Sequence, residues 1–283
     1  MPSYLITGAS RGVGLSADSN NTVIGLVRDK PATEKKVKDE LHARSNIYIL
    51  QADITSYSAL QARHNQTPGS YSSTNAPKQN AVAETAKITG GTLDYLIANA
   101  GLISHFDAYD PIGVLGNQPE VLEQGLLECF KVNVIGNIHL FNLFTPLILK
   151  GQAKKVIAIS SGQADLELIP KFSIDLAAAY SISKAGLNMA VAKFSAQYAK
   201  DGVLFMSICP GVVETGQFTS ATEEQMKSLS GMFAKFVEYA PHFKGPSTPE
   251  SAARDVISVM HKASVEKGDG GSFVSHFGNK QWI

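Results

Sequence analysis

The sequence has few cysteines and no excess of charge of either sign. Two cysteines, Cys129 and Cys209, occur in 283 residues, both in apolar stretches. They match neither a disulfide framework nor a cysteine metal cluster. The 25 Lys and Arg residues balance the 25 Asp and Glu residues. A nucleic-acid partner or a membrane surface bound through charge would require a basic excess, so we expect neither.

Long apolar runs and metal-ligand spacings are also missing. No apolar run approaches the roughly 18 to 20 residues that a membrane span requires. The chain passes from residues 1–3 directly into Tyr4-Leu5-Ile6, which leaves no room for a signal peptide. His64, His105 and His261 have no metal-ligand spacing, so we expect no metal site. Because 44% of the residues are hydrophobic, the chain can bury a large core, and we expect a soluble, cytoplasmic protein.

Short β-branched runs alternate with longer segments that have apolar residues at helical spacing. The expected strands are 4–7, 22–27, 47–51, 93–98, 155–160, 203–209 and 272–274. The expected helices are 35–44, 81–89, 118–149, 177–200 and 249–266. This alternation predicts βαβ units. We therefore expect an α/β fold with a doubly wound parallel sheet, in a single domain over residues 1–283.

Two segments depart from this regular pattern. If residues 8–14 form a turn, only residues 15–21 remain for a helix before the second strand. A helix of that length rises about 10 Å, whereas a five-residue strand is about 17 Å long, so no full covering helix fits.

The second segment, residues 63–80, is rich in Ser, Asn, Gln, Thr and Pro. This composition predicts a disordered surface insert, with a functional lid as the alternative.

A glycine-rich turn follows the first expected strand, in the order Thr7-Gly8-Ala9-Ser10-Arg11-Gly12-Val13-Gly14. Glycines let the backbone turn sharply and approach a pyrophosphate, whose charge then meets the free N–H groups of a helix N-terminus. A purely structural turn is the alternative. Its position after the first strand of a βαβ pattern favours a dinucleotide site.

Three further motifs follow in chain order: Asn99-Ala100-Gly101 after the fourth strand, Tyr180-x-x-x-Lys184, and Pro210-Gly211 after the sixth strand. With the glycine turn, they resemble the short-chain dehydrogenase/reductase (SDR) family, and within it the carbonyl-reductase-like group typified by sniffer and the C-signal protein. The resemblance implies a Rossmann fold and an oxidoreductase that interconverts a carbonyl and a secondary alcohol. It also implies a homodimer or homotetramer through the helices at 118–149 and 177–200.

Tyr180 and Lys184 lie four residues apart, so on a helix they share one face. A phenol with a pKa near 10 exchanges protons poorly at neutral pH unless a nearby cation favours its ionised form. We expect Lys184 to supply that cation and to lower the pKa of Tyr180. The resemblance adds two catalytic residues. Ser161, or its neighbour Ser160, would bind the substrate carbonyl, and Asn133 would hold a water that links Lys184 to solvent.

The charge at the end of the second strand predicts the cofactor. An acidic residue there would bind a ribose hydroxyl and repel a 2′-phosphate, but this chain has Arg28 and, in the glycine turn, Arg11. Guanidinium groups suit phosphate recognition, so NADP(H) is favoured over NAD(H). A shift of one residue would place Asp29 there instead. Further cofactor contacts implied by the resemblance are Asp53, Asn99, Ala100, Gly101, Tyr180, Lys184, Pro210, Gly211, Val213 and Thr215.

The segment 216–248 carries Met and Phe residues at helical spacing and is expected to be a variable substrate lid. Its apolar face favours a hydrophobic substrate, such as an intermediate of secondary metabolism. A helix that packs on the core is the plainer alternative. The function expected is thus NADP(H)-dependent reduction of a ketone or aldehyde. The alternatives are a non-catalytic NADP(H)-binding regulator and an enzyme impaired by its short first crossover.

Overall fold

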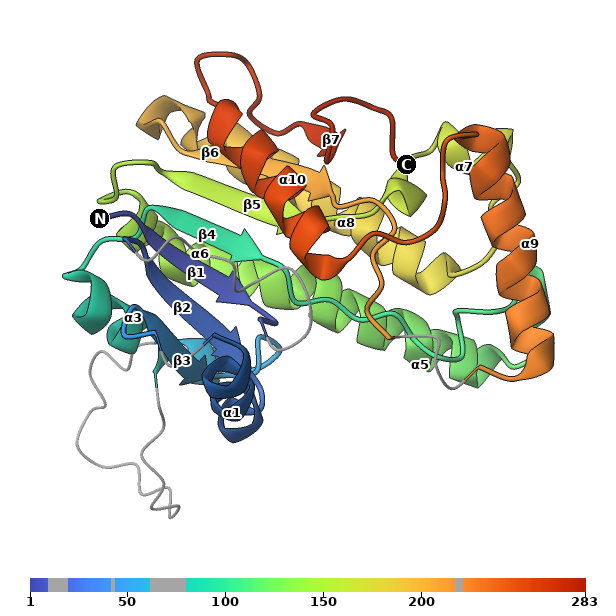
Figure 1. Cartoon of the computed structure of the whole chain (residues 1–283), viewed down its shortest axis with the longest axis horizontal. Helices are drawn as coiled ribbons and strands as arrows, with labels where there is room; N and C mark the ends of the chain where they lie inside the picture. Colours follow the sequence, from blue (N-terminus) through green and yellow to red (C-terminus); the bar gives the residue numbers. More distant parts are fainter. Residues whose placement is uncertain (10–19, 42–43, 62–79, 217–220) are drawn as a thin grey trace.

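The computed structural model describes residues 1–9, 20–41, 44–61, 80–216 and 221–283, which form a twisted parallel sheet covered by helices (Figure 1). The strands lie in the order β3-β2-β1-β4-β5-β6-β7, and every pair is parallel. Their bounds are β1 Ser3–Thr7, β2 Thr22–Val27, β3 Ile47–Gln51, β4 Tyr95–Ala98, β5 Lys155–Ile159, β6 Leu204–Cys209 and β7 Phe273–Ser275. The predicted fold class is confirmed.

Helices lie between most of the strands along the chain. Their bounds are α1 Lys30–Leu41, α2 Tyr57–Leu60, α3 Ala81–Thr89, α4 Ile112–Leu115, α5 Pro119–Phe130, α6 Gly136–Ile148, α7 Leu168–Lys171, α8 Ala178–Tyr198, α9 Glu223–Tyr239 and α10 Pro249–Lys262. Shorter helical segments are the π-helix η1 Lys131–Ile135 and the 3₁₀ turns η2 Gly162–Ala164 and η3 Ala199–Asp201.

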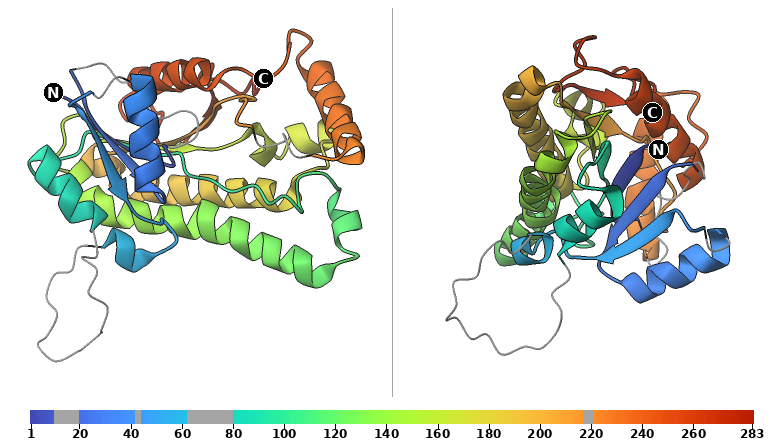
Figure 2. Two further views of the ribbon diagram at one scale, coloured as in Figure 1. Left: turned by 60° about the horizontal axis from the view of Figure 1, so that its bottom comes forward. Right: turned by 90° about the vertical axis from the view of Figure 1, so that its left-hand side faces the viewer.

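Successive residues of each central strand enter two different cores, one on each side of the sheet. In β5, Val156 and Ala158 pack toward α6 and α8, whereas Ile157 and Ile159 pack toward α10. The same alternation occurs in β4 and β6. The right-hand view of Figure 2 shows the helices on both sides of the sheet. Burial on both faces explains why these strands are continuous apolar runs rather than alternating ones.

Two expected helices differ from those in the structure. The helix expected at 35–44 begins at Lys30, because Asp29 caps it: its Oδ1 accepts a hydrogen bond from the Ala32 amide at 3.0 Å. The helix expected at 118–149 is divided by η1 into α5 and α6. Neither difference changes the topology, because both helices stay in their predicted place along the chain.

Parts of the predicted irregular segments lie outside the described residues. These are residues 10–19 of the first crossover and 63–79 of the polar insert. The structure does place β1 and β2 side by side in parallel, with Ser3 opposite Thr22. The proposed lid, 216–248, contains α9, whose Leu229, Met232 and Phe236 are buried. Its role as a lid remains a prediction.

Candidate active site

A cleft of about 1170 Å³ lies at the carboxyl ends of the strands and extends from the end of β2 to α9. It includes the point where the strand order reverses beside β1, which is where ligands bind in open α/β sheets. Of the predicted site residues, the cleft is lined by Gly8, Arg28, Asp53, Asn99, Ala100, Gly101, Ser161, Tyr180, Lys184, Pro210, Gly211, Val213 and Thr215. Ser10, Arg11, Gly12, Val13 and Gly14 lie outside the described residues.

The ends of β1 and β4 are joined by a small hydrogen-bond network. The hydroxyl of Thr7 accepts hydrogen bonds from the backbone amides of Asn99 at 3.1 Å and Ala100 at 3.0 Å. The side-chain amide of Asn99 donates to the Thr7 carbonyl at 3.0 Å. Gly8 follows in a left-handed conformation, and a Cβ there would lie 2.8 Å from the Ala100 Cα. Only glycine therefore fits at the first position of the turn.

Basic side chains lie at the β2 end of the cleft. Arg28 and Asp29 are both exposed and both line the cleft, and the Oδ1 of Asp29 accepts a hydrogen bond from the Ala32 amide at the start of α1. Sequence analysis did not identify Lys36, on α1, which also lines the cleft. Lys36 belongs to none of the sequence motifs, so only the position of α1 beside the cleft reveals it. Asp53 accepts hydrogen bonds from both the amide and the hydroxyl of Thr55, each at 2.8 Å.

Ser161, Tyr180 and Lys184 meet at the centre of the cleft. The Ser161 hydroxyl forms a hydrogen bond with the Tyr180 side chain and accepts one from the Gln163 amide at 3.3 Å. The ammonium group of Lys184 lies 5.6 Å from the centre of the Tyr180 ring and donates to the Ile159 carbonyl at 2.7 Å. Ser160 is buried and its hydroxyl has no partner among the described residues. The contact with Tyr180 favours Ser161 over Ser160.

Burial is the main cause of the pKa shifts of Tyr180 and Lys184. Burial raises the pKa of the Tyr180 phenol above its usual value, and the hydrogen bond from Ser161 offsets this only in part. Burial also lowers the pKa of Lys184 to about 8. The expected lowering of the Tyr180 pKa by Lys184 is not seen in this structure, because burial dominates the shift and the Lys184 charge is not among its causes. A raised pKa keeps the phenol protonated, which is the form that donates a proton.

Asn133 lies behind the cleft in the π-helix η1. Its Oδ1 accepts a hydrogen bond from the Leu102 amide at 2.8 Å. Its Nδ2 donates hydrogen bonds to the Leu102 carbonyl and to the Ser183 hydroxyl, each also at 2.8 Å. A Cβ on Gly101 would lie 3.3 Å from the Lys184 nitrogen and 3.4 Å from the Asn133 Oδ1. Asn133 and Lys184 therefore flank Gly101. A π-helical turn within a helix is frequent at functional sites, and the 3.6-residue pattern of the sequence did not reveal it.

Asp107 is a second residue that sequence analysis missed. Its side chain is buried. One carboxylate oxygen accepts a hydrogen bond from the Ala179 amide at 2.8 Å, and the other accepts one from the Tyr180 amide at 2.9 Å. The backbone carbonyl of Asp107 accepts a hydrogen bond from the amide of Ala177, a residue whose backbone is in the left-handed conformation. Asp107 thus fixes the start of α8 at Tyr180. No sequence signal indicated it, because the cap lies far away in the chain.

The other end of the cleft is apolar and aromatic, with a few polar groups. Its lining residues, from four separate segments of the chain, are Ile103, His105, Tyr109, Gln163, Leu168, Met232, Phe233, Phe236, Trp282 and Ile283. Many of them belong to a third hydrophobic cluster, distinct from the two sheet cores. His105, to which the sequence assigned nothing, lies edge-on to Tyr109 at 5.1 Å.

The described residues fit a nicotinamide dinucleotide. The cleft is continuous from the basic end at Arg28 to Tyr180 and Lys184, and the backbone at Gly8 has no room for a side chain. Gly211 likewise accepts no Cβ, because the His276 ring would lie 2.9 Å from it. A glycine turn beside Arg28 and Lys36 suits an extended anionic ligand.

Two further features concern metals and membranes. In the described ranges, no group of three or more His, Cys, Asp or Glu residues is placed to bind a metal ion. Of the helices that the structure describes, none combines the length and apolar character needed to cross a bilayer.

The sequence profile of the short chain dehydrogenases matches residues 69–226. The chain is 59% identical to the short chain dehydrogenase virK of Hypocrea virens and 49% identical to the short-chain dehydrogenase/reductase iacC of Pestalotiopsis fici, with 100% of each chain covered. Among solved structures, it resembles the carbonyl reductase Sniffer of D. melanogaster, with 20% identity, a TM-score of 0.72, and coverage of 99% of this chain and 98% of that chain. It resembles an NADPH-bound carbonyl reductase from chicken fatty liver at 22% identity, with the same TM-score and coverage. At such identities, these structures show the fold alone.

Proposed function

The chain belongs to the short-chain dehydrogenase/reductase family, and from this premise we propose that it is an NADP(H)-dependent oxidoreductase that interconverts a ketone or aldehyde and the corresponding alcohol. One observation carries the proposal. The Ser161 hydroxyl contacts the Tyr180 side chain in the cleft, with Lys184 one helical turn further along α8. This places a proton donor and a second hydroxyl at one point, as reduction of a carbonyl requires.

In the reduction, the chain's residues bind the carbonyl oxygen and protonate it. When bound, the nicotinamide supplies the hydride that adds to the carbonyl carbon. Ser161 and Tyr180 hydrogen-bond the carbonyl oxygen, and Tyr180 transfers its proton as negative charge develops there. The proton is replaced from solvent, so the products are an alcohol and the oxidised cofactor. We assign Lys184 to the nicotinamide ribose and Asn133 to the proton path from solvent.

Arg28 supports the preference for a 2′-phosphate. Arg28 is exposed at the edge of the cleft. Asp29 lines the same end, but its Oδ1 accepts a hydrogen bond from the Ala32 amide at the start of α1. A hydrogen bond to a charged group contributes about 1.5–3 kcal/mol, which corresponds to a roughly 10- to 100-fold effect. We expect Arg28→Glu to lower the ratio of kcat/KM with NADPH to kcat/KM with NADH by that factor.

Steady-state rates with both cofactors measure this ratio. Arg254→Glu is the matched control, because Arg254 is exposed on α10 and does not line the cleft. It makes the same change of charge and should leave the ratio unchanged. An equal ratio in Arg28→Glu and wild type would show that Arg28 does not select the cofactor.

Consumption of NADPH with a panel of aromatic and aliphatic ketones tests the reaction itself. The fall in absorbance at the NADPH band should match the alcohol formed, one for one. The rival function, a regulator that binds NADP(H) without turnover, predicts a different result: tight NADPH binding by titration, with no ketone converted. The presence of Tyr180, Ser161 and Lys184 in a common cleft favours the enzyme.

A further inference from the structure

The segment Asn279–Ile283 reaches the apolar end of the cleft, where Trp282 and Ile283 are among the lining residues. Trp282 is 3% exposed although it lies in a segment without helix or strand. Its indole stacks on Phe273 of β7, with ring centres 4.3 Å apart. The Lys280 ammonium lies 5.6 Å from the centre of the Trp282 ring, so the indole is packed on its own segment as well as at the cleft wall.

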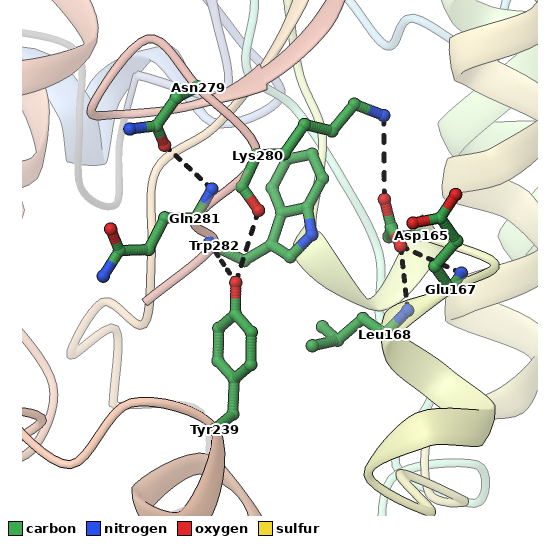
Figure 3. Close-up of polar contacts among 8 residues, drawn as sticks. All are labelled: Asp165, Glu167, Leu168, Tyr239, Asn279, Lys280, Gln281 and Trp282. Atoms are coloured by element: carbon green, nitrogen blue, oxygen red, sulfur yellow. Dashed lines mark hydrogen bonds and ion pairs between the residues drawn. The ribbon is translucent and has the colours of Figure 1, made fainter.

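Hydrogen bonds and an ion pair hold this segment between α9 and the loop after β5 (Figure 3). Tyr239 lies at the end of α9. Its hydroxyl accepts a hydrogen bond from the Trp282 amide at 3.0 Å and donates one to the Lys280 carbonyl at 3.3 Å. The Lys280 ammonium lies 3.8 Å from an oxygen of Asp165. Asp165 in turn accepts a hydrogen bond from the amide of Leu168, the first residue of α7, at 2.9 Å. The indole is therefore positioned by backbone and side-chain contacts together.

Trp282 also lies next to the candidate catalytic centre. Gly162 directly follows Ser161, and a Cβ on Gly162 would lie 2.7 Å from the Trp282 Cβ. Glycine at this position is what allows the tryptophan to come so close. A group attached to a carbonyl that is bound by Ser161 and Tyr180 would therefore meet the residues around Trp282.

We propose that Trp282 is a specificity-determining residue whose indole forms one wall of a subsite for a planar aromatic group of the substrate. The other walls are the aromatic and aliphatic side chains of Tyr109, Leu168 and Phe236, which line the same end of the cleft. Flat, rigid rings bind favourably against aromatic side chains. The inference rests on the proposed function, since it assigns the substrate class of that site.

Tryptophan fluorescence tests the subsite without turnover, because Trp282 is the sole tryptophan of the chain. The probe is 1-phenylethanol, titrated into the NADPH-saturated protein so that no hydride acceptor is present, with N-acetyltryptophanamide as the control for collisional quenching. We expect a saturable change in emission, absent with 2-butanol. Binding of 1-phenylethanol by equilibrium dialysis without a change in emission would overturn the proposal, as would no binding at all.

Variants then test specificity. In Trp282→Ala, kcat/KM for acetophenone should fall by roughly 10- to 200-fold, the range for a lost apolar contact in a substrate pocket. For 2-butanone it should change less than about twofold, and the Kd of NADPH should stay the same. Trp282→Phe, which retains an aromatic ring against Phe273, should lose less. Phe277→Ala is the matched control, because Phe277 is 52% exposed in the same part of the chain.

These outcomes separate the inference from the proposed function. An equal loss for both ketones in Trp282→Ala, or an unchanged preference, would overturn the aromatic subsite while leaving the reductase intact. If the wild type reduces neither ketone, the proposed function fails, and the fluorescence titration alone then decides whether Trp282 contacts an aromatic ligand. If Trp282→Ala does not fold, the acetophenone preference of Trp282→Phe against wild type gives the same decision.

Discussion

At the residue scale, the structure adds side chains that act on the candidate site through the backbone. Tyr180 and Lys184 could be predicted from a short motif, because a spacing of four residues places both on one helix face. Ser161, or its neighbour Ser160, was implied only by the family resemblance. Asp107 and Trp282 were not predicted, since each reaches the site from a distant segment. Residues of this kind carry no local pattern, so only the folded chain places them beside the candidate catalytic group.

Asp107→Asn tests whether the cap at α8 positions Tyr180. An asparagine offers one acceptor oxygen in place of two, so the amide of Ala179 or Tyr180 loses its partner. Loss of an N-terminal cap costs about 0.5–2 kcal/mol. We expect a lower unfolding free energy by that amount, and a lower kcat with an unchanged Kd of NADPH.

Steady-state kinetics and urea unfolding measure the two effects. Asp110→Asn is the control, because Asp110 is exposed and outside the cleft lining. A loss of stability in Asp107→Asn with kcat at the wild-type value would mean that the cap serves folding and not the position of Tyr180.

At the element scale, apolar periodicity located the strands well and the helix ends less well. The strands were recognisable because burial on both faces requires continuous β-branched runs, as in Val156–Ile159. The start of α1 and the π-turn η1 were missed, since the first depends on the Asp29 cap and the second departs from the 3.6-residue period. The π-turn carries Asn133, so the least predictable stretch of that helix belongs to the candidate site.

Lys155 illustrates a contact between elements that the strand pattern concealed. It begins β5, and its ammonium donates to the carbonyls of Met260 at 3.0 Å, His261 at 3.1 Å and Ala263 at 2.8 Å, which form the end of α10. A cation there satisfies carbonyls that lack helical partners. We expect Lys155→Met to lower the unfolding free energy by about 1–2 kcal/mol, measured by urea unfolding.

The control for this change is Lys193→Met, which removes the same charge from an exposed position on α8. Its unfolding midpoint should match the wild type. Equal midpoints for both variants would contradict the assigned role of Lys155 at α10.

At the scale of the whole molecule, apolar side chains remain exposed on the paired helices α5 and α8. They are Val121, Leu127, Phe130, Ile135 of the adjoining η1, Ile182 and Met189, and Leu127 and Met189 are each more than 60% exposed. Clustered exposed apolar groups are typical of interaction surfaces. We expect a homodimer or homotetramer through these helices, in line with the resemblance.

Light scattering coupled to size-exclusion chromatography measures the assembly. The double change Leu127→Glu and Met189→Glu should yield a smaller species, because it would bury two charges in the contact. Val114→Glu, at a similarly exposed apolar position on α4, is the control and should leave the mass unchanged. A wild-type protein that is monomeric at all concentrations would contradict this surface assignment.

The central claim, that Tyr180 donates the proton in carbonyl reduction, is tested most directly by the kcat of Tyr180→Phe with NADPH and a reducible ketone. Tyr198→Phe, on the same helix but outside the cleft lining, is the control. A general acid contributes about 10²- to 10⁴-fold, so kcat should fall by that factor while the variant still binds NADPH. The control should keep the wild-type rate. A Tyr180→Phe enzyme with a kcat within about twofold of the wild type would contradict the account.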